Sequence, residues 1–360
     1  MADEPLDFTF KKVDDKDTTW YARRELGHPD DPYNKNCKKV SKDDPQYKEW
    51  LKIGADLCDQ LEKDILQDEG DGWVFLADTD GVVSHRKENE GSNILTFKGC
   101  TVIPSTAEII RLFLIQMDQR KYWDPTFVEG NFEYEAEVTA RLVTNVYSAP
   151  WPVSYRDFVC IASEALREDG LFLAGIHSIE HDEFPDRDGF VRGIIYSSGF
   201  VIKPIEGTPD GLPQCRVWYT GTVDTAGWIP VAVANVVNSN QPQNLASLRK
   251  LVISVADMLM DVIKDLFRLE SFTAANIENI FSSALEKHGH DEHPDILYDA
   301  LKNYFLEKRV GPTDEDLLNQ METQGKKNTM HKIFRSFQHY MLTMKDGKEI
   351  YAMAQEFFSK

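Results

Sequence analysis

The sequence predicts an α+β fold, in which a curved antiparallel sheet of nine strands closes on one long helix and an all-α extension follows. Two observations predict it. Between residues 73 and 223, short apolar runs alternate with turn signals, which is typical of consecutive hairpins. From Leu245 to Leu266, apolar residues recur at steps of three and four, which indicates a helix with a broad apolar face. Such a face must be buried.

Composition limits the function classes. The chain has 360 residues, enough for one large domain and a smaller one, and 42% of them are hydrophobic. Its formal net charge of −20 argues against a nucleic-acid partner, because neutralising phosphates requires an excess of Lys and Arg. Anionic membranes should also repel its average surface, so any membrane contact is expected to be transient.

The sequence carries no signal that directs it out of the cytoplasm. The first residues are polar, which predicts neither a signal nor a transit peptide, and no apolar run reaches the ~20 residues of a membrane-spanning helix. The cysteines are odd in number and widely spaced, namely Cys37, Cys58, Cys100, Cys160 and Cys215. We expect free thiols and a cytoplasmic protein.

The spacing of apolar residues and the turn residues predict the first helices and strands. Residues 1–43 are predicted to be an acidic, partly extended leader. The spacing of Trp50, Ile53 and Leu57 predicts a helix over residues 47–67. Three strands follow at 73–77, 82–86 and 94–102, the first two joined by a hairpin at Asp80-Gly81, and a helix from Ser105 to about Met117 comes next.

Six further strands are predicted, at 132–137, 140–148, 157–163, 171–179, 190–203 and 214–223. The long helix is expected to lie across the mouth of the curved sheet, a helix-grip arrangement that leaves a hydrophobic cavity between them. The predicted domain therefore spans 44–268. Residues 269–360 are predicted to form a separate helical extension.

Four motifs resemble the START lipid-transfer family. They are Arg120–Asp124, Pro150–Val159, Gly189–Gly193, and Asp224–Pro230 followed by Leu245–Arg249, and their order and spacing match as well. The resemblance covers about residues 47–267. It implies a helix-grip domain that encloses a single lipid, transfers or senses it, needs no cofactor and performs no catalysis.

The resemblance also implies which residues contact the lipid. In the phosphatidylcholine-transfer branch, the Arg of the first motif contacts the phosphate, and Arg120 stands at that position. That branch surrounds choline with aromatic rings: Tyr196 keeps a tyrosine, Phe158 replaces another, and Asn145 stands where a tryptophan is expected. Because an asparagine makes no cation–π contact, the ligand could carry a polar head group other than choline, which Asn145 could hydrogen-bond.

The sterol-binding branch has a buried Arg a few residues after the second motif, where this sequence has Ala162. A glycerophospholipid is therefore preferred over a sterol. Strand alternation puts Arg192 and Tyr196 on one face with Ser198. Arg192 either contacts the lipid or pairs with a carboxylate to brace the sheet. The second interpretation is favoured. The expected lipid-binding set is Arg120, Asn145, Phe158, Arg192, Tyr196, Val255 and Leu259, the last two from the long helix.

Two other functions stay open. A helix-grip enzyme would need an acid–base pair among His177, Asp157, Tyr196 and Arg192. Alternatively, the C-terminal helices dock a protein partner and the preceding domain only senses lipid.

Three weaker signals favour plain structural roles. Pro150-Trp151-Pro152 suits a gate or a bilayer-touching tip, but a Trp packed on its own loop is favoured. His288, His290 and His293 match no standard ligand spacing, so no metal is expected. The basic residues around Phe334 indicate an ordinary helix with a charged face.

Overall fold

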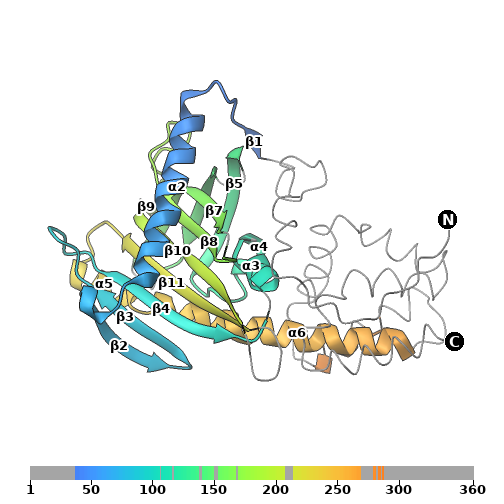
Figure 1. Ribbon diagram of the computed structural model, residues 1–360. Helices are drawn as coiled ribbons and strands as arrows, with labels where there is room; N and C mark the ends of the chain where they lie inside the picture. The colour runs from blue at the N-terminus through green and yellow to red at the C-terminus, as the bar shows by residue number, and fades with distance from the viewer. Residues whose placement is uncertain are drawn as a thin grey trace. The chain divides into compact units, whose positions relative to one another are not determined.

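The computed structural model describes residues 37–105, 107–115, 117–137, 140–149, 153–167, 169–206 and 214–268, together with the pairs 279–280, 283–284 and 286–287 (Figure 1). Residues 26–253 form one compact unit, and from Ser254 onwards the chain belongs to a second. Three predictions lie outside the described residues: the tip at 150–152, the first 36 residues of the leader and nearly all of the helical extension.

The element order explains how the sheet is built. The strands are β1 (Lys38–Lys39), β2 (Trp73–Thr79), β3 (Val82–Lys87), β4 (Thr96–Ile103), β5 (Phe127–Glu137), β6 (Ala140–Tyr147), β7 (Tyr155–Leu166), β8 (Phe172–Ser178), β9 (Phe190–Arg192), β10 (Ile194–Ile205) and β11 (Gln214–Asp224). The helices are α2 (Pro45–Leu66), α3 (Ala107–Ile115), α4 (Met117–Arg120), α5 (Val231–Asn238) and α6 (Asn244–Arg268), with short 3-10 turns at Glu69–Asp71 and Gln241–Gln243.

The nine predicted strands are all present, and two very short ones join them. The sheet runs in the order β1-β5-β6-β7-β8-β10-β11-β4-β3-β2. Every pairing between the nine longer strands is antiparallel, whereas β1 pairs with β5, and β9 with β7, in parallel. β9 and β10 arise because the predicted strand at 190–203 is interrupted at Gly193. The two-residue turn between β2 and β3 has positive φ at both Asp80 and Gly81, as the Asp-Gly signal predicts.

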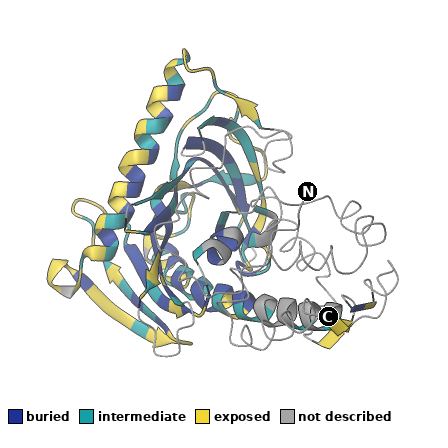
Figure 2. Cartoon of the chain, turned by 45° about the vertical axis from the view of Figure 1, so that its right-hand side comes forward, coloured by how far each residue is buried: buried dark blue, intermediate teal, exposed yellow. Residues whose placement is uncertain are grey.

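Helix α2 covers one face of this sheet (Figures 1 and 2). It begins where the Asp44 side chain accepts a hydrogen bond from the Gln46 amide, with Pro45 in the first turn. Its buried stripe includes Leu57 and Leu61, which pack on β8 and β10 in a core cluster. A cross-strand glycine pair, Gly175 and Gly199, lets the helix approach the sheet closely.

Helices α3 and α4 lie on the opposite, inner face of the sheet. Side chains alternate along β7, so neighbouring residues report both faces. The Ser163 hydroxyl lies 3.6 Å from the Cys58 thiol of α2, whereas the Glu164 carboxylate accepts hydrogen bonds from Arg111 of α3. The sheet is therefore covered on both sides, and its inner face is closed by the short helices that follow β4.

Helix α6 begins on the sheet, as the periodicity predicts. Leu245, Leu248 and Val252 are all fully buried. The Arg249 guanidinium reaches the β2–β3 turn, where it donates hydrogen bonds to the carbonyls of Asp80 and Gly81 and, at 3.1 Å, to the Thr101 hydroxyl. These bonds fix the start of α6 against the hairpin.

None of the five cysteines forms a disulfide, as predicted. Burial raises the pKa of the Cys100 thiol to about 11 and that of Cys160 to about 12. Because the thiolate is the reactive form, these buried thiols are inert at neutral pH. None of the described helices has the length and apolar character that crossing a bilayer requires.

The glycine pair gives a test of how α2 is seated. A Cβ atom at Gly199 would lie 2.5 Å from the Ala174 carbonyl oxygen and 2.6 Å from Leu61 Cδ1. Overpacking of this kind costs ~1–3 kcal/mol. We expect Gly199→Val to lower the free energy of unfolding by about that amount in urea titrations, whereas Leu66→Ala, at an exposed position, should leave it unchanged. An unaltered midpoint for Gly199→Val would contradict this packing.

Candidate functional site

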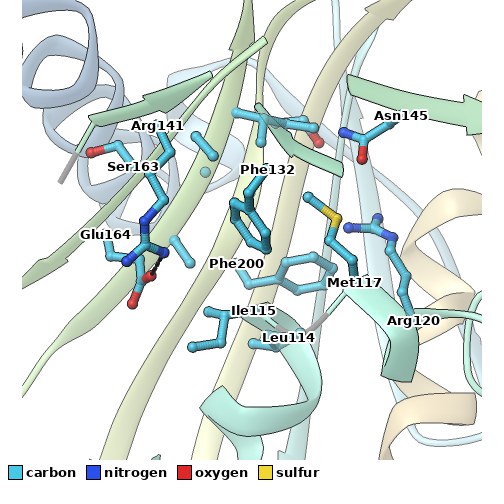
Figure 3. A pocket seen from close by; sticks show the side chains of 16 residues that line it. Leu114, Ile115, Met117, Arg120, Phe132, Arg141, Asn145, Ser163, Glu164 and Phe200 are labelled. Atoms are coloured by element: carbon cyan, nitrogen blue, oxygen red, sulfur yellow. Dashed lines mark hydrogen bonds and ion pairs between the residues drawn. The ribbon is translucent and has the colours of Figure 1, made fainter. Parts of the chain in front are cut away.

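A cavity lies between the inner face of the sheet and helices α3 and α4 (Figure 3). Side chains of both helices form one wall, and strands β5 to β8 and β10 form the other. The lining residues are Leu114, Ile115, Met117, Arg120, Phe132, Arg141, Asn145, Ala162, Ser163, Glu164, Ala174, Gly175, Ile176, Ser198, Gly199 and Phe200. All of them belong to the compact unit of residues 26–253.

The middle of the cavity is apolar and its two ends are polar (Figure 3). Phe132 and Phe200 face each other across the centre, with Met117 and Leu114 beside them. Arg120 and Asn145 lie at one end, and Arg141 and Glu164 lie at the other. An amphiphile therefore finds apolar surface in the middle and hydrogen-bonding groups at both ends.

Arg120 is held in place by aromatic rings and one carboxylate. Its guanidinium carbon lies 5.0 Å from the ring centre of Trp123 and 5.6 Å from those of Phe127 and Tyr147. Its Nε donates a hydrogen bond of 3.2 Å to Asp124, which is fully buried. Burial disfavours the charge of Arg120, but Tyr147 and Asp124 outweigh this effect and raise its pKa. The cation is stable at the cavity wall.

Asn145 carries an unsatisfied polar atom at the same end. The residue is 3% exposed, and its side-chain oxygen has no hydrogen-bond partner within the described residues. A buried polar group left without a partner costs ~1–3 kcal/mol. The end of the cavity with Arg120 is therefore equipped for hydrogen bonds that the surrounding side chains do not make.

The charged residues at the opposite end form a chain of ion pairs. Arg141 donates from Nε to Glu135 and from Nη1 to Glu164, both at 3.2 Å. Glu164 also accepts from Arg111 at 2.6 Å, and Glu135 from Lys39 at 2.6 Å. Arg111, Glu135 and Arg141 are each at most 3% exposed. Mutual pairing compensates the desolvation of these charges.

The cavity is small as the side chains lie. Its volume is about 80 Å³. Pockets for drug-sized ligands measure ~300–1,000 Å³, so this space is several times smaller. A whole lipid fits only after the wall moves. Met117 is unbranched and adaptable, which makes it a wall residue that is able to give way.

Two of the seven expected contact residues, Arg120 and Asn145, line this cavity, whereas Phe158 and Arg192 do not. Phe158 sits directly across from Asn145 in the strand pairing but belongs to a packed cluster with Val143 and Ile195. Arg192 pairs with Asp157 at 2.8 Å and donates to the Phe184 carbonyl, the bracing role that the sequence analysis favoured.

Tyr196 departs from the predicted strand alternation. The register of β10 against β11 shifts between Ile195 and Ser197, which is a β-bulge. Tyr196 is therefore not on the inner face with Ser198. It is 46% exposed and lines a separate groove of about 580 Å³ beside the end of α2. Its contact with a lipid stays a prediction, as does that of Val255 and Leu259, whose side chains lie outside the described residues.

Helices α3 and α4 form the wall of the cavity opposite the sheet. Within the part of α6 whose side chains are described, no residue lines the cavity. Leu245, Leu248 and Val252 are buried completely and take no part in the lining.

Sequence reasoning missed the ion-pair chain. Arg141 lies directly opposite Ala162 in the pairing of β6 with β7, so a guanidinium enters the cavity beside the position where the sterol-binding branch has its own Arg. A signal was present. Arg141, Val143 and Asn145 share one face of a predicted strand, so a charge on the inward face was detectable. Its partners on β5, β7 and α3 were not.

Comparisons with known proteins agree with this architecture. The model of the START domain matches residues 53–252. StAR-related lipid transfer protein 5 of Pongo abelii is 28% identical over 213 residues, which cover 56% of this chain and 96% of that protein. The mitochondrial steroidogenic acute regulatory protein of Gallus gallus is 24% identical over 48% of this chain, and the match spans 64% of that protein.

One solved structure supports the fold. Human StAR-related lipid transfer protein 5 superposes with a TM-score of 0.50 and 20% identity, covering 56% of this chain and 97% of that one. The agreement concerns the sheet and its helices, and at this identity it carries no information about the ligand.

The ion-pair chain generates a stability test. Replacing Arg141 by Met leaves Glu135 and Glu164 buried with fewer partners, and breaking a buried pair in this way costs ~3–5 kcal/mol. We expect Arg141→Met to lower the unfolding midpoint in urea strongly. The control, Lys52→Met, removes an exposed ion pair with Asp56 and should have no measurable effect. Equal midpoints for the two variants would rule out a structural role for the chain.

Proposed function

The chain belongs to the START domain family, and from this premise we propose that it binds one polar lipid in its inner cavity and carries it between membranes without changing it chemically. Relatives whose names describe lipid transfer support this general class. The observation that carries the proposal is the cavity itself, which has an apolar middle and an end where Arg120 and Asn145 offer hydrogen bonds.

The head group is proposed to be a phosphate ester, so that a glycerophospholipid is the preferred ligand. A guanidinium presents a planar fork of donors that suits phosphate oxygens, and Nε is the only nitrogen of Arg120 for which the described residues provide a hydrogen bond. The Asn145 amide adds donor or acceptor capacity next to it. The rings around Arg120 already contact its own cation, which favours a head group other than choline.

A sterol is the second candidate because of one specific observation. Arg141 brings a guanidinium to the cavity opposite Ala162, paired with Glu164. A paired guanidinium and carboxylate can hydrogen-bond a single hydroxyl at that end. This arrangement favours a ligand whose polar group is small and uncharged.

The enzyme alternative finds little support. Asp157 is engaged by Arg192, and the His177 ring contacts the Tyr196 carbonyl. None of these four residues lines the inner cavity in the described part of the chain. General acid–base catalysis requires its groups within hydrogen-bond reach of one substrate, and these four do not converge there.

A cytoplasmic location is part of the same proposal, supported by five cysteines that form no disulfide with one another. Docking of a protein partner by residues 269–360 stays a prediction, which a truncation after residue 268 would test through transfer activity.

Native mass spectrometry of the full chain, with extraction of any lipid it retains, tests the ligand class. We expect one phospholipid per chain. Arg120→Lys keeps the charge but loses the fork of donors, so phospholipid occupancy should fall about tenfold. The control, Arg216→Lys at an exposed position on β11, should keep wild-type occupancy. Recovery of a sterol supports the second candidate, and protein that stays empty after incubation with vesicles would sink the carrier proposal.

Asn145 gives a sharper test because function and stability should move in opposite directions. Asn145→Val removes the buried oxygen without a partner, so the free energy of unfolding should stay level or rise by ~1 kcal/mol. Lipid occupancy should fall. Thermal unfolding and lipid extraction on the same preparation measure both, and a variant that is destabilised with unchanged occupancy would assign Asn145 a purely structural role.

A further inference from the structure

Helix α5 presents its apolar side to solvent. Val233, Val236 and Val237, spaced as neighbours on one helical face, are 50%, 66% and 44% exposed, and Val231 in the first turn is 40% exposed. Ala234 and Asn238 occupy the buried side. A surface helix normally shows the reverse pattern. Valine is also a weak helix former, so local helix stability does not explain these residues.

Polar anchors hold this helix in its inverted orientation. The Asn238 side chain donates to the Val223 carbonyl at 2.8 Å, at the end of β11. Asn235 donates to the Asn93 carbonyl at 2.9 Å and accepts from the Leu95 amide at 3.2 Å. The side-chain amides of Asn235 and Asn238 therefore attach this helix to the rest of the domain, a role that apolar side chains have in most helices. The valines are left free on the outside.

The turn before α5 adds an exposed indole. Trp228 is 72% exposed. Ala226 and Gly227 both have positive φ, which turns the chain sharply just before it, and the Arg156 side chain donates to the carbonyls of Thr225 and Ala226. A non-glycine residue in this conformation needs support from its surroundings, which Arg156 supplies. The tryptophan is thus presented from an anchored turn.

The charge pattern points to one kind of partner. The chain has a net charge of −20, yet no Asp, Glu, Lys, Arg or His occurs between Asp224 and Arg249. Anionic lipid head groups repel the average surface of such a protein, and they repel this segment least. An indole next to aliphatic side chains suits the boundary between head groups and acyl chains, where Trp is enriched.

The size of the patch favours a bilayer over a protein. Trp228 and the four valines are five residues, whereas stable protein interfaces use ~20–30 residues on each side. These side chains also offer almost no directional hydrogen bonds with which to recognise a protein. Shallow insertion into a bilayer needs only buried apolar area.

We propose that Trp228 and the exposed valines of α5 form a docking surface that inserts reversibly into the interfacial region of a lipid bilayer. The inference deepens the proposed function, on which its purpose rests, by naming the face through which a lipid carrier would meet a membrane. The weak, uncharged contact suits brief visits, because a small apolar area gives rapid release.

Flotation of the full-length protein with vesicles of phosphatidylcholine alone tests this surface. The variant Val233→Asp/Val236→Asp places two charges on the patch, and Trp228→Ala removes the indole. We expect each to lower the fraction bound about tenfold. The control, Leu66→Asp/Val74→Asp, adds the same charge at positions that are 76% and 53% exposed elsewhere, and should bind within twofold of wild type.

Three results would overturn the proposal: a wild-type chain that does not float with vesicles, patch variants that bind as wild type does, or an equal loss in the control. A wild-type dimer that the patch variants convert to a monomer in size-exclusion chromatography would do so as well, because a second copy would then cover the surface. Lipid extracted from the same preparations separates the two proposals. If the wild-type protein floats with vesicles but carries no lipid, the result counts against the carrier alone. If it carries lipid and the patch variants float as the wild type does, the result counts against the docking surface alone.

Discussion

The inner half of this fold depends on the two bonds that Arg141 makes inside the sheet. Its guanidinium joins Glu135 of β5 to Glu164 of β7, and Glu164 in turn holds Arg111 of α3. These strands and the helix above them are tied together by charges that are largely buried. Removing Arg141 would leave two buried carboxylates with one cation each, so the ion pairs link β5, β6 and β7 to the position of α3.

This constraint makes the two ends of the cavity different. The end with Arg141 has its charges matched within the protein, so it is stable when the cavity holds nothing. The end with Arg120 has one bond from Nε to Asp124, and the Asn145 oxygen next to it has none. A folded protein tolerates such a deficit mainly where a ligand or water repairs it. The end with Arg120 and Asn145, where hydrogen bonds are still missing, is therefore the end that is suited to a ligand's polar group.

Local sequence signals predicted most of the elements, and long-range geometry accounts for what they missed. The Asp80-Gly81 turn, the stripe of α2 and the nine strands follow from short-range chemistry. The β-bulge after Ile195 has no comparable signature, and it removes Tyr196 from the inner face. Arg141 was recognisable as an inward charge, but its partners come from three other elements. The wall formed by α3 and α4 depends on packing that periodicity alone does not encode.

The small volume of the cavity follows from the energetics of empty space. An unfilled cavity costs ~24 cal/mol per Å³, so the observed 80 Å³ costs about 2 kcal/mol. At the same rate, an empty void of ~500 Å³ would cost about 12 kcal/mol, comparable to the entire stability of a typical domain at ~5–15 kcal/mol. Walls held that far apart therefore need the contacts of a bound molecule. Burial of acyl chains returns ~0.8 kcal/mol per methylene, which is the term able to hold the walls apart. An apolar ligand that fills the space between the walls is therefore one term in the stability of a wider cavity.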